Sequence, residues 1–276
     1  MSDTGFLGCA KSIYLLGESH CLPFRNVLLQ PTSPGDIFFA RIRFMQIFAA
    51  NFMSETGLHP DIVKALQGEQ VLDDQGAAMH LKKDRLTYRT AEVSDIPVSE
   101  PTLVMFGGDL DVFDILRQVG EGFDFELPDD PGYGVNQNLT PIPYSVLYSL
   151  VTRLFVPFFA ACKYLKSIGF RKLMVHTLPP RIRDAGQLIL PGTAQTRAKL
   201  TVMANRVIRN SCAELNMPYI DIWDSITDDG WLRPNLCLKD GVHLSRATAL
   251  LSMGQIIEKM QPAPAPASVP APAAAG

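Results

Sequence analysis

The sequence predicts an α/β fold in which an open, mainly parallel β-sheet is covered by helices on both faces. Short apolar runs alternate along the chain with longer segments of helical spacing, and most of the short runs stop at glycine or proline. The predicted strands cover residues 12–16, 102–106, 171–177 and 218–223, and the predicted helices cover residues 145–168, 195–215 and 245–260.

Two of the predicted strands have especially clear ends. Ser12–Leu16 is apolar and stops at a Gly17-Glu18 turn, where glycine gives the backbone freedom to change direction. Thr102–Phe106 is a continuous apolar run stopped by Gly107-Gly108, which is typical of a parallel strand buried on both faces. Residues 36–44 alternate loosely in polarity and are compatible with a further strand.

The remaining segments follow the same alternation. Residues 144–165 are the most apolar stretch, but Arg153, Pro157 and Lys163 interrupt it, so we expect a buried helix and no membrane span. Residues 45–53 and 61–66 have helical spacing. Residues 120–143 are rich in Gly, Pro, Asp and Asn, which predicts a long loop of the kind that often serves a binding site.

Composition places the chain among ordinary globular proteins. Of its 276 residues, 47% are hydrophobic and 19% are charged, and the net charge is −3. We expect one domain over residues 1–260 and a disordered Pro/Ala-rich tail over residues 261–276. The small basic clusters, Lys82-Lys83 with Arg85 and Arg181 with Arg183, are expected on the solvated surface, so nucleic-acid binding has no support.

The cysteines favour a reducing compartment. Cys9, Cys21, Cys162, Cys212 and Cys237 are an odd number without metal-ligand spacing, and we expect them to be free thiols. Residues 1–11 have neither a basic region nor a long apolar run, so no secretory signal is expected and the predicted location is the cytoplasm.

Ser19 is the candidate nucleophile. It follows the first predicted strand at a point where a helix can start, and the free N–H groups of a helix start can stabilise a developing oxyanion. The same position also suits a serine that only caps a helix.

Asp240 and His243 favour the catalytic interpretation. A serine hydroxyl needs a general base, and the base needs a carboxylate that orients it. Asp240 and His243 are three residues apart, before the final predicted helix, so the carboxylate can reach one imidazole nitrogen and leave the other for Ser19. Parallel sheets bind ligands at the carboxyl ends of their strands, and Ser19, Gly108 and the loop of Asp240 and His243 are all expected near that edge.

These motifs resemble those of the SGNH/GDSL hydrolase superfamily, over nearly the whole chain up to Met260. The family's Gly-Asp-Ser block corresponds to Gly17-Glu18-Ser19, and its Asp-x-x-His block corresponds to residues 240–243. Residues 219–222 and 229–232 also resemble the family's approach to that second block.

The resemblance implies a flavodoxin-like three-layer α/β/α sandwich and ester hydrolysis without a metal or organic cofactor. Ser19 would attack the acyl carbonyl, His243 would take its proton, and Asp240 would hold the imidazole. The implied partner is a small-molecule or glycan acyl ester, and a carbohydrate O-acetyl group is plausible by family analogy alone.

The chain departs from the family at the oxyanion hole. Glu18 replaces the usual Asp, and the best alignment of the Gly-x-Asn-Asp block is residues 108–111, with Leu110 in place of Asn. Either Asn136 or Asn138 supplies the missing donor, or the N–H groups of Ser19 and Gly108 act alone, or the site is catalytically weak. Gly76 is a candidate for the glycine of the family's second block.

Other interpretations stay open from the sequence. Cys21 is a rival nucleophile, although a buried thiol suits it better, and His176 is expected to be a satisfied core histidine. A metallophosphoesterase would need an Asn-His pair, which the sequence lacks. An O-acyltransferase with the same triad, or a glycan- or acyl-binding module on a degenerate hydrolase scaffold, are the alternatives. The acyl group, the alcohol and the oligomeric state are not defined by the sequence.

Overall fold

The computed structural model describes the main sheet, its covering helices and the loops that join them. The described residues are 12–17, 23–24, 36–41, 53–54, 57–58, 71–72, 78–79, 102–107, 115–117, 119–129, 132–167, 170–183, 191–238 and 243–260. The expected helix over residues 61–66, the expected tail over residues 261–276, Gly76 and all of the expected helix over residues 45–53 except Met53 lie outside them; Met53 belongs to a short strand.

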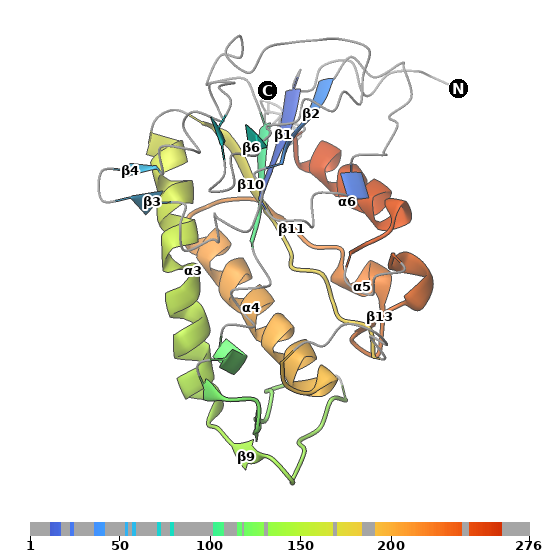
Figure 1. Ribbon diagram of the computed structural model, residues 1–276. Helices are drawn as coiled ribbons and strands as arrows, with labels where there is room; N and C mark the ends of the chain where they lie inside the picture. Colours follow the sequence, from blue (N-terminus) through green and yellow to red (C-terminus); the bar gives the residue numbers. More distant parts are fainter. Residues whose placement is uncertain are drawn as a thin grey trace, which may run out of the picture.

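The fold is an α/β sandwich built on a five-stranded parallel sheet (Figure 1). The strand order is β11-β10-β7-β1-β2, which is the flavodoxin-like order and confirms the predicted fold class. β1 therefore lies inside the sheet, between β2 and β7. The strands are β1 (Ser12–Gly17), β2 (Asp36–Arg41), β7 (Thr102–Phe106), β10 (Lys172–His176) and β11 (Tyr219–Ile220).

The carboxyl ends of four strands are aligned across the sheet. Gly17 at the end of β1 pairs with Phe106 at the end of β7, and Phe106 pairs with His176 at the end of β10. His176 in turn pairs with Ile220 at the end of β11. The segments that follow β1, β7 and β10 therefore start at one edge of the sheet.

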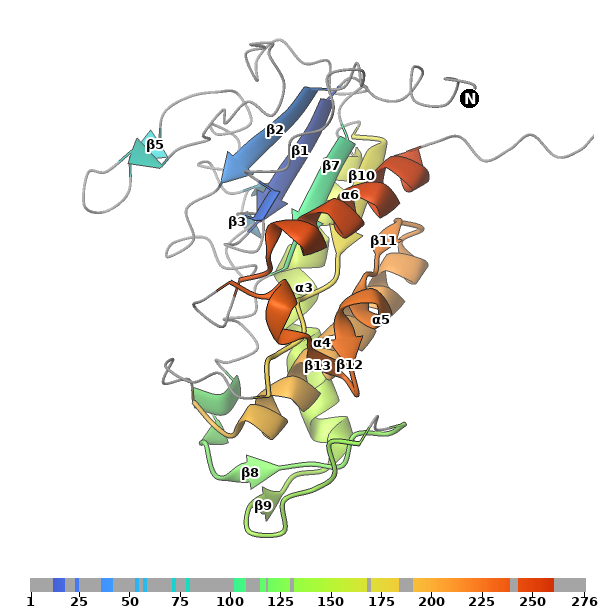
Figure 2. The same cartoon turned by 90° about the vertical axis from the view of Figure 1, so that its right-hand side faces the viewer.

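Helices cover the two faces of the sheet, as the alternation predicts. α3 (Tyr144–Ser167) and α4 (Ala194–Glu214) lie on one face, and α6 (Arg246–Met260) lies on the other (Figure 2). Side chains of β7 alternate between the two: Leu103 and Met105 belong to the core with α3 and α4, whereas Val104 and Phe106 belong to the core with α6. Burial on both faces explains why β7 is apolar at consecutive positions.

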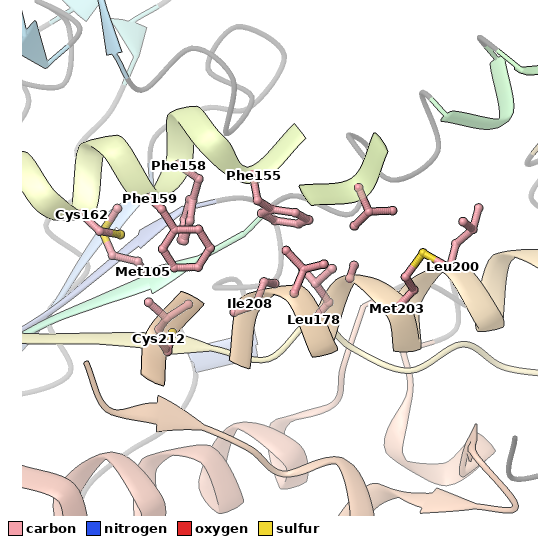
Figure 3. Packing of buried hydrophobic residues seen from close by; sticks show 14 of the residues in the cluster. Met105, Phe155, Phe158, Phe159, Cys162, Leu178, Leu200, Met203, Ile208 and Cys212 are labelled. Carbon is pink, nitrogen blue, oxygen red and sulfur yellow. The ribbon is translucent and has the colours of Figure 1, made fainter. Parts of the chain in front are cut away.

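The larger core lies between the sheet and the pair α3 and α4 (Figure 3). Aromatic rings of α3 meet edge to face there, with Phe158 against Phe155 at 6.2 Å and against Phe159 at 5.1 Å between ring centroids. Gly107 closes this core at the end of β7, because a Cβ atom there would lie 3.1 Å from Phe155 Cε1 and 3.7 Å from Ile208 Cδ1.

α3 and α4 extend well beyond the carboxyl edge of the sheet. Gly107 marks that edge, and it lies beside Phe155 and Ile208, so the first eleven or so residues of α3 continue for about 16 Å past it. The predicted long loop fills the space between these helix ends and carries two short paired strands, β8 (Phe123–Asp124) and β9 (Thr140–Pro141).

Among the described residues, α3 is the one helix long and apolar enough to cross a membrane, with a mean hydropathy of 1.6. Its inner side chains belong to the large core. Its exposed side chains are mostly polar, among them Ser149, Thr152, Arg153 and Lys163. This division between the two faces agrees with the expected buried helix.

Some boundaries differ from the sequence prediction. The strand expected over residues 218–223 is shorter, because Asp221 Oδ1 accepts a hydrogen bond from the Trp223 backbone N–H at 3.1 Å and α5 (Trp223–Ile226) begins there. A hairpin of β12 (Thr227–Asp228) and β13 (Trp231–Leu232) follows, with Asp229 and Gly230 at φ of 49° and 79°. Positive φ at both positions is the signature of a type I′ turn.

Short elements outside the main sheet complete the described structure. They are the strand pairs β3 (Met53–Ser54) with β4 (Gly57–Leu58) and β5 (Val71–Leu72) with β6 (Ala78–Met79), and the 3₁₀ helix η4 (Pro234–Leu236).

The expectation that Arg181 is a solvated surface residue is wrong. Arg181 is only 6% exposed, and its carbonyl accepts the Leu232 N–H at 2.8 Å. Arg183 lies over the Trp231 ring at 5.6 Å. A sequence pattern of two nearby arginines does not reveal this, because the burial comes from the hairpin of β12 and β13, which folds back onto the segment after β10.

Three of the five cysteines lie in the described residues, and all three are free, as expected. Cys162 of α3 and Cys212 of α4 are buried in the same core (Figure 3). Burial raises the pKa of the Cys212 thiol to about 12 and also raises the pKa of the Cys162 thiol. Cys237 is half-buried, and its Sγ donates to the His243 carbonyl at 3.2 Å.

These environments predict selective alkylation. With iodoacetamide at pH 8, we expect Cys237 to react in the native protein while Cys162 and Cys212 react only after unfolding in urea, because the thiolate is the nucleophile and theirs is suppressed. Peptide mass mapping before and after urea addition measures this. Equal rates for Cys162 and Cys237 in native buffer would contradict the described core.

Candidate functional site

The segment that carries Ser19 is fixed at both of its described flanks. Ser19 itself lies outside the described residues. Before it, Leu15 of β1 is fully buried in the core under α6. After it, Phe24 is 1% exposed in the same core and meets Phe106 edge to face at 5.5 Å. The chain around Ser19 therefore starts and ends against the α6 side of the sheet, at its carboxyl edge.

The glycine pair after β7 is described only in part. Gly107 is buried toward α3 and α4, where its missing side chain permits close packing with Phe155. Gly108 and Leu110 lie outside the described residues, so the assignment of the Gly108 N–H to the oxyanion hole stays a prediction.

His243 lies at the end of a closed loop before α6. Its carbonyl accepts the Leu238 N–H at 2.7 Å, and the Ser245 N–H donates to the Leu236 carbonyl at 2.8 Å. Leu244 is buried and forms an isolated antiparallel bridge with Cys237. These bonds hold His243 at a defined place and bring the backbones of Leu238 and His243 together. Asp240 lies between them, outside the described residues.

α6 is fastened to the ends of two strands by side-chain hydrogen bonds. Ser252 Oγ lies 2.8 Å from His176 Nε2 at the end of β10. Gln255 binds the backbone of Asp221 after β11 twice: its Oε1 accepts the Asp221 N–H at 2.9 Å, and its Nε2 donates to the Asp221 carbonyl at 2.5 Å. The helix that follows His243 is thus held in register with the sheet edge.

His176 is the satisfied core histidine that the sequence predicts. It is 2% exposed, and both ring nitrogens have partners.

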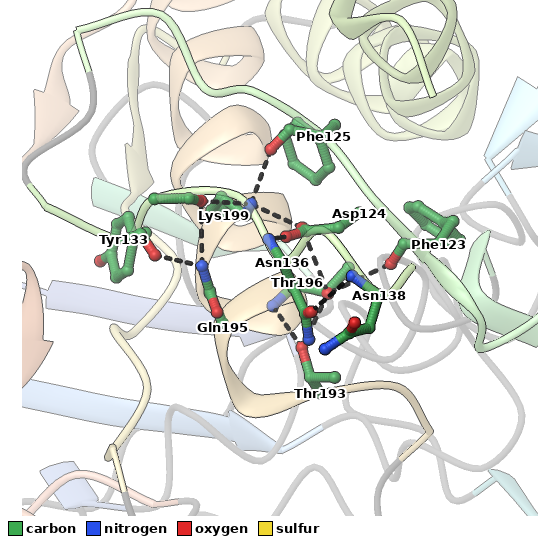
Figure 4. A network of polar contacts seen from close by, with 11 residues as sticks. Phe123, Asp124, Phe125, Tyr133, Asn136, Asn138, Thr193, Gln195, Thr196 and Lys199 are labelled. Carbon is green, nitrogen blue, oxygen red and sulfur yellow. Dashed lines mark hydrogen bonds and ion pairs between the residues drawn. The ribbon is translucent and has the colours of Figure 1, made fainter. Parts of the chain in front are cut away.

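Lys199 and Asp124 form a buried ion pair, and their contacts hold the long loop (Figure 4). Nζ of Lys199 lies 2.5 Å from Asp124 Oδ1 and donates to the carbonyls of Phe125 at 2.6 Å and Gly134 at 2.8 Å. Both side chains are buried almost completely. Because the lysine and the carboxylate satisfy each other, the long loop, whose described strands are two residues each, can be fixed against α4.

Further bonds join the same loop to the start of α4. Thr193 caps the helix by accepting the Thr196 N–H at 3.0 Å. Gln195 Nε2 donates to the carbonyls of Tyr133 and Gly134, and the Tyr133 hydroxyl donates to the Gly230 carbonyl at 2.6 Å. The loop therefore links α4 to the hairpin of β12 and β13.

The structure argues against Asn136 as the missing oxyanion donor. Its N–H donates to Asp124 Oδ2 at 2.8 Å, and its side-chain oxygen accepts the Asn138 N–H at 3.0 Å (Figure 4). Asp124 is bound to Lys199, which lies nine residues before Ile208 on α4, or about 13 Å from the level of Gly107. The assignment of the oxyanion donors stays a prediction, because Ser19 and Gly108 lie outside the described residues.

Sequence reasoning did not identify Lys199, Ser252 or Gln255 as positioning groups. For Lys199 a signal was present, because it shares the helical spacing of the buried positions Thr196 and Met203 on α4. Gln255 binds the backbone of Asp221, and a sequence pattern cannot reveal a contact with a distant backbone group.

A separate pocket, open to solvent, lies between α4 and the end of β11. Arg209 and Asp221 form an ion pair across it, and burial raises the pKa of the Tyr219 hydroxyl within it. None of the predicted site residues lines it. In the part of the chain that the structure describes, no group of three His, Cys, Asp or Glu side chains is arranged to hold a metal ion.

No protein-family model and no curated protein matches the chain. Among solved structures, it is similar to a lipase/acylhydrolase from Enterococcus faecalis, at 15% identity and a TM-score of 0.38, over 91% of this chain and 95% of that chain. It is also similar to a protein from Slackia heliotrinireducens assigned as an SGNH hydrolase, at 13% identity and a TM-score of 0.39, over 91% of this chain and 100% of that chain.

The buried pair gives a prediction about stability. We expect Lys199→Met to lower the free energy of unfolding by about 3–5 kcal/mol, because it leaves the Asp124 carboxylate buried without its counter-charge. Urea unfolding followed by circular dichroism measures the change.

The exposed pair of Arg233 and Asp228, with 3.0 Å between Nε and Oδ1, is the matched control. Asp228→Asn should lower the free energy of unfolding by less than about 1 kcal/mol. The double variant Lys199→Met with Asp124→Leu should recover part of the loss, since it removes both charges. Equal effects of Lys199→Met and Asp228→Asn would contradict the role of the buried pair.

Proposed function

We propose that the protein is a serine hydrolase of the SGNH type that cleaves an acyl ester through Ser19, His243 and Asp240. One observation carries the proposal: the described flanks of Ser19 and the helix that follows His243 share one core at the carboxyl edge of the sheet. Leu15 and Phe24 on one side and Ala249 and Met253 on the other belong to that core.

The chemistry follows from the residue types. The Ser19 hydroxyl attacks the carbonyl carbon of the ester, and His243 accepts its proton at one ring nitrogen. Asp240 accepts a hydrogen bond from the other ring nitrogen and stabilises the imidazolium. His243 then gives the proton to the leaving alcohol, and water releases the acyl group in a second round with the same base.

The oxyanion is stabilised by the N–H groups of Ser19 and Gly108. A site with two donors, where the related family has an additional Asn, is expected to be slower, since removal of one donor costs on the order of a hundred- to thousandfold in rate. The substrate class that we propose is a small or glycan-linked acyl ester, and a carbohydrate O-acetyl group is one candidate.

Reaction with a fluorophosphonate probe tests the nucleophile and its base. The probe traps only an activated serine, so intact mass spectrometry should show one adduct on the wild type and none on Ser19→Ala or His243→Ala. Ser149→Ala is the control, because Ser149 is exposed on α3 and its hydroxyl donates only to the Ser145 carbonyl at 2.8 Å. It should react like the wild type.

Each other outcome has a definite meaning. A folded wild type without an adduct would contradict hydrolysis and favour a glycan- or acyl-binding module. An adduct that survives in Ser19→Ala would show that the nucleophile is another residue, and Cys21 would be tested next. If the adduct behaves as expected but acyl transfer to a sugar hydroxyl outpaces hydrolysis, the enzyme is an O-acyltransferase.

A further inference from the structure

His176 contacts all three segments that lead to the proposed site. It ends β10 and lies in register with Phe106 of β7, which in turn lies in register with Gly17 of β1. Its side chain points to the face covered by α6, which crosses β1, β7 and β10 (Figure 2).

The imidazole packs within a group of three rings. It stacks on Phe106 with 4.6 Å between centroids and 21° between planes. Phe24 meets it edge-on at 6.1 Å and 88°, and meets Phe106 at 5.5 Å. All three rings are buried, so their relative positions are fixed by contact.

Two hydrogen bonds fix the orientation of the ring. Nδ1 lies 2.7 Å from the Thr177 carbonyl, which can only accept, so Nδ1 carries the proton. In the neutral ring Nε2 is therefore the acceptor, and the Ser252 hydroxyl of α6 donates to it at 2.8 Å. An apolar side chain could fill the same space, but it could not bind α6 at a defined position.

Each contact lies close in sequence to a residue of the proposed site. Phe24 follows Ser19 by five positions, Phe106 precedes Gly108 by two, and Ser252 lies on the helix that begins three residues after His243. We propose that His176 is a positioning residue that sets the nucleophile, oxyanion and base segments relative to one another. This inference rests on the proposed function.

Among these contacts, the hydrogen bond to Ser252 is the one made to α6, the helix that follows the proposed base His243. Loss of the bond lets α6 shift against the sheet, and a displacement near 1 Å at His243 can cost about a hundredfold in rate. Such a change raises the barrier of the chemical step, so it lowers kcat and leaves KM nearly unchanged.

Two conservative variants separate the bonds. In His176→Gln the side-chain amide reaches the place of Nε2 and keeps the bond to Ser252. In His176→Asn it reaches only the place of Nδ1 and keeps the bond to Thr177. Both variants lose the stacked ring, and His176→Asn also lacks one methylene group, so Ser252→Ala, which keeps the ring, separates loss of the bond from loss of packing.

The experiment measures kcat and KM with p-nitrophenyl acetate, together with the rate of the fluorophosphonate reaction. We expect kcat to fall about ten- to hundredfold in His176→Asn and in Ser252→Ala, with KM changed less than about threefold. His176→Gln should keep kcat within about threefold of the wild-type value. Met253→Leu, on the same helix and in the same core, should behave like the wild type.

The possible results are distinguishable. If His176→Asn does not fold, Ser252→Ala alone carries the test. Equal kcat values for His176→Asn and His176→Gln, with Ser252→Ala like the wild type, would show that His176 only packs the core, while the proposed function stands. A wild type that neither turns over the ester nor reacts at Ser19 would overturn the proposed function, and the positioning role with it.

Discussion

The alignment of parallel strands in one sheet is the constraint on which the rest of this structure depends. Parallel pairing brings the ends of β1, β7, β10 and β11 to one edge, so that Gly17, Phe106, His176 and Ile220 follow one another across it. Residues far apart in sequence then need only short connections to share a site. α6 completes the arrangement, because its contacts with β10 and with the residue after β11 fix its height against that edge.

A second constraint acts beyond the sheet. α3 and α4 are longer than the strands that they cover, and their first turns would face one another without a sheet between them. The loop after β7 fills this space and brings Asp124 to Lys199. A buried charge pair contributes little net stability but is costly to break, so it specifies one position of the loop more than it strengthens the fold.

The elements that the sequence predicts well are those in which buried side chains recur at a regular spacing. β7 and β10 have the predicted limits within a residue or two, as do α3, α4 and α6, because each buries side chains on a regular pattern. The burial of Arg181 was not predicted, since it depends on contact between distant segments. The same holds for Lys199 and Asp124, which are 75 positions apart. The short hairpin after α5 is local, and its Asp229-Gly230 turn is a signal that the sequence does carry. The order of Ser19, Gly108 and His243 along the chain indicated one edge, but a chain order cannot give the distances between side chains.

The place of β1 in the sheet has a consequence for biosynthesis. β1 is made before β2 and β7, yet it lies between them, and the sheet cannot continue on its β7 side until residues 102–106 have been made. The base that we propose follows Ser19 by more than two hundred residues, on the loop before the last helix. A growing chain would therefore carry the proposed nucleophile without the partner that activates it until the residues of that loop have been made. In the proposed enzyme, reactivity would begin only when α6 closes the second face of the sheet, so that completion of the fold and the onset of reactivity would be the same event.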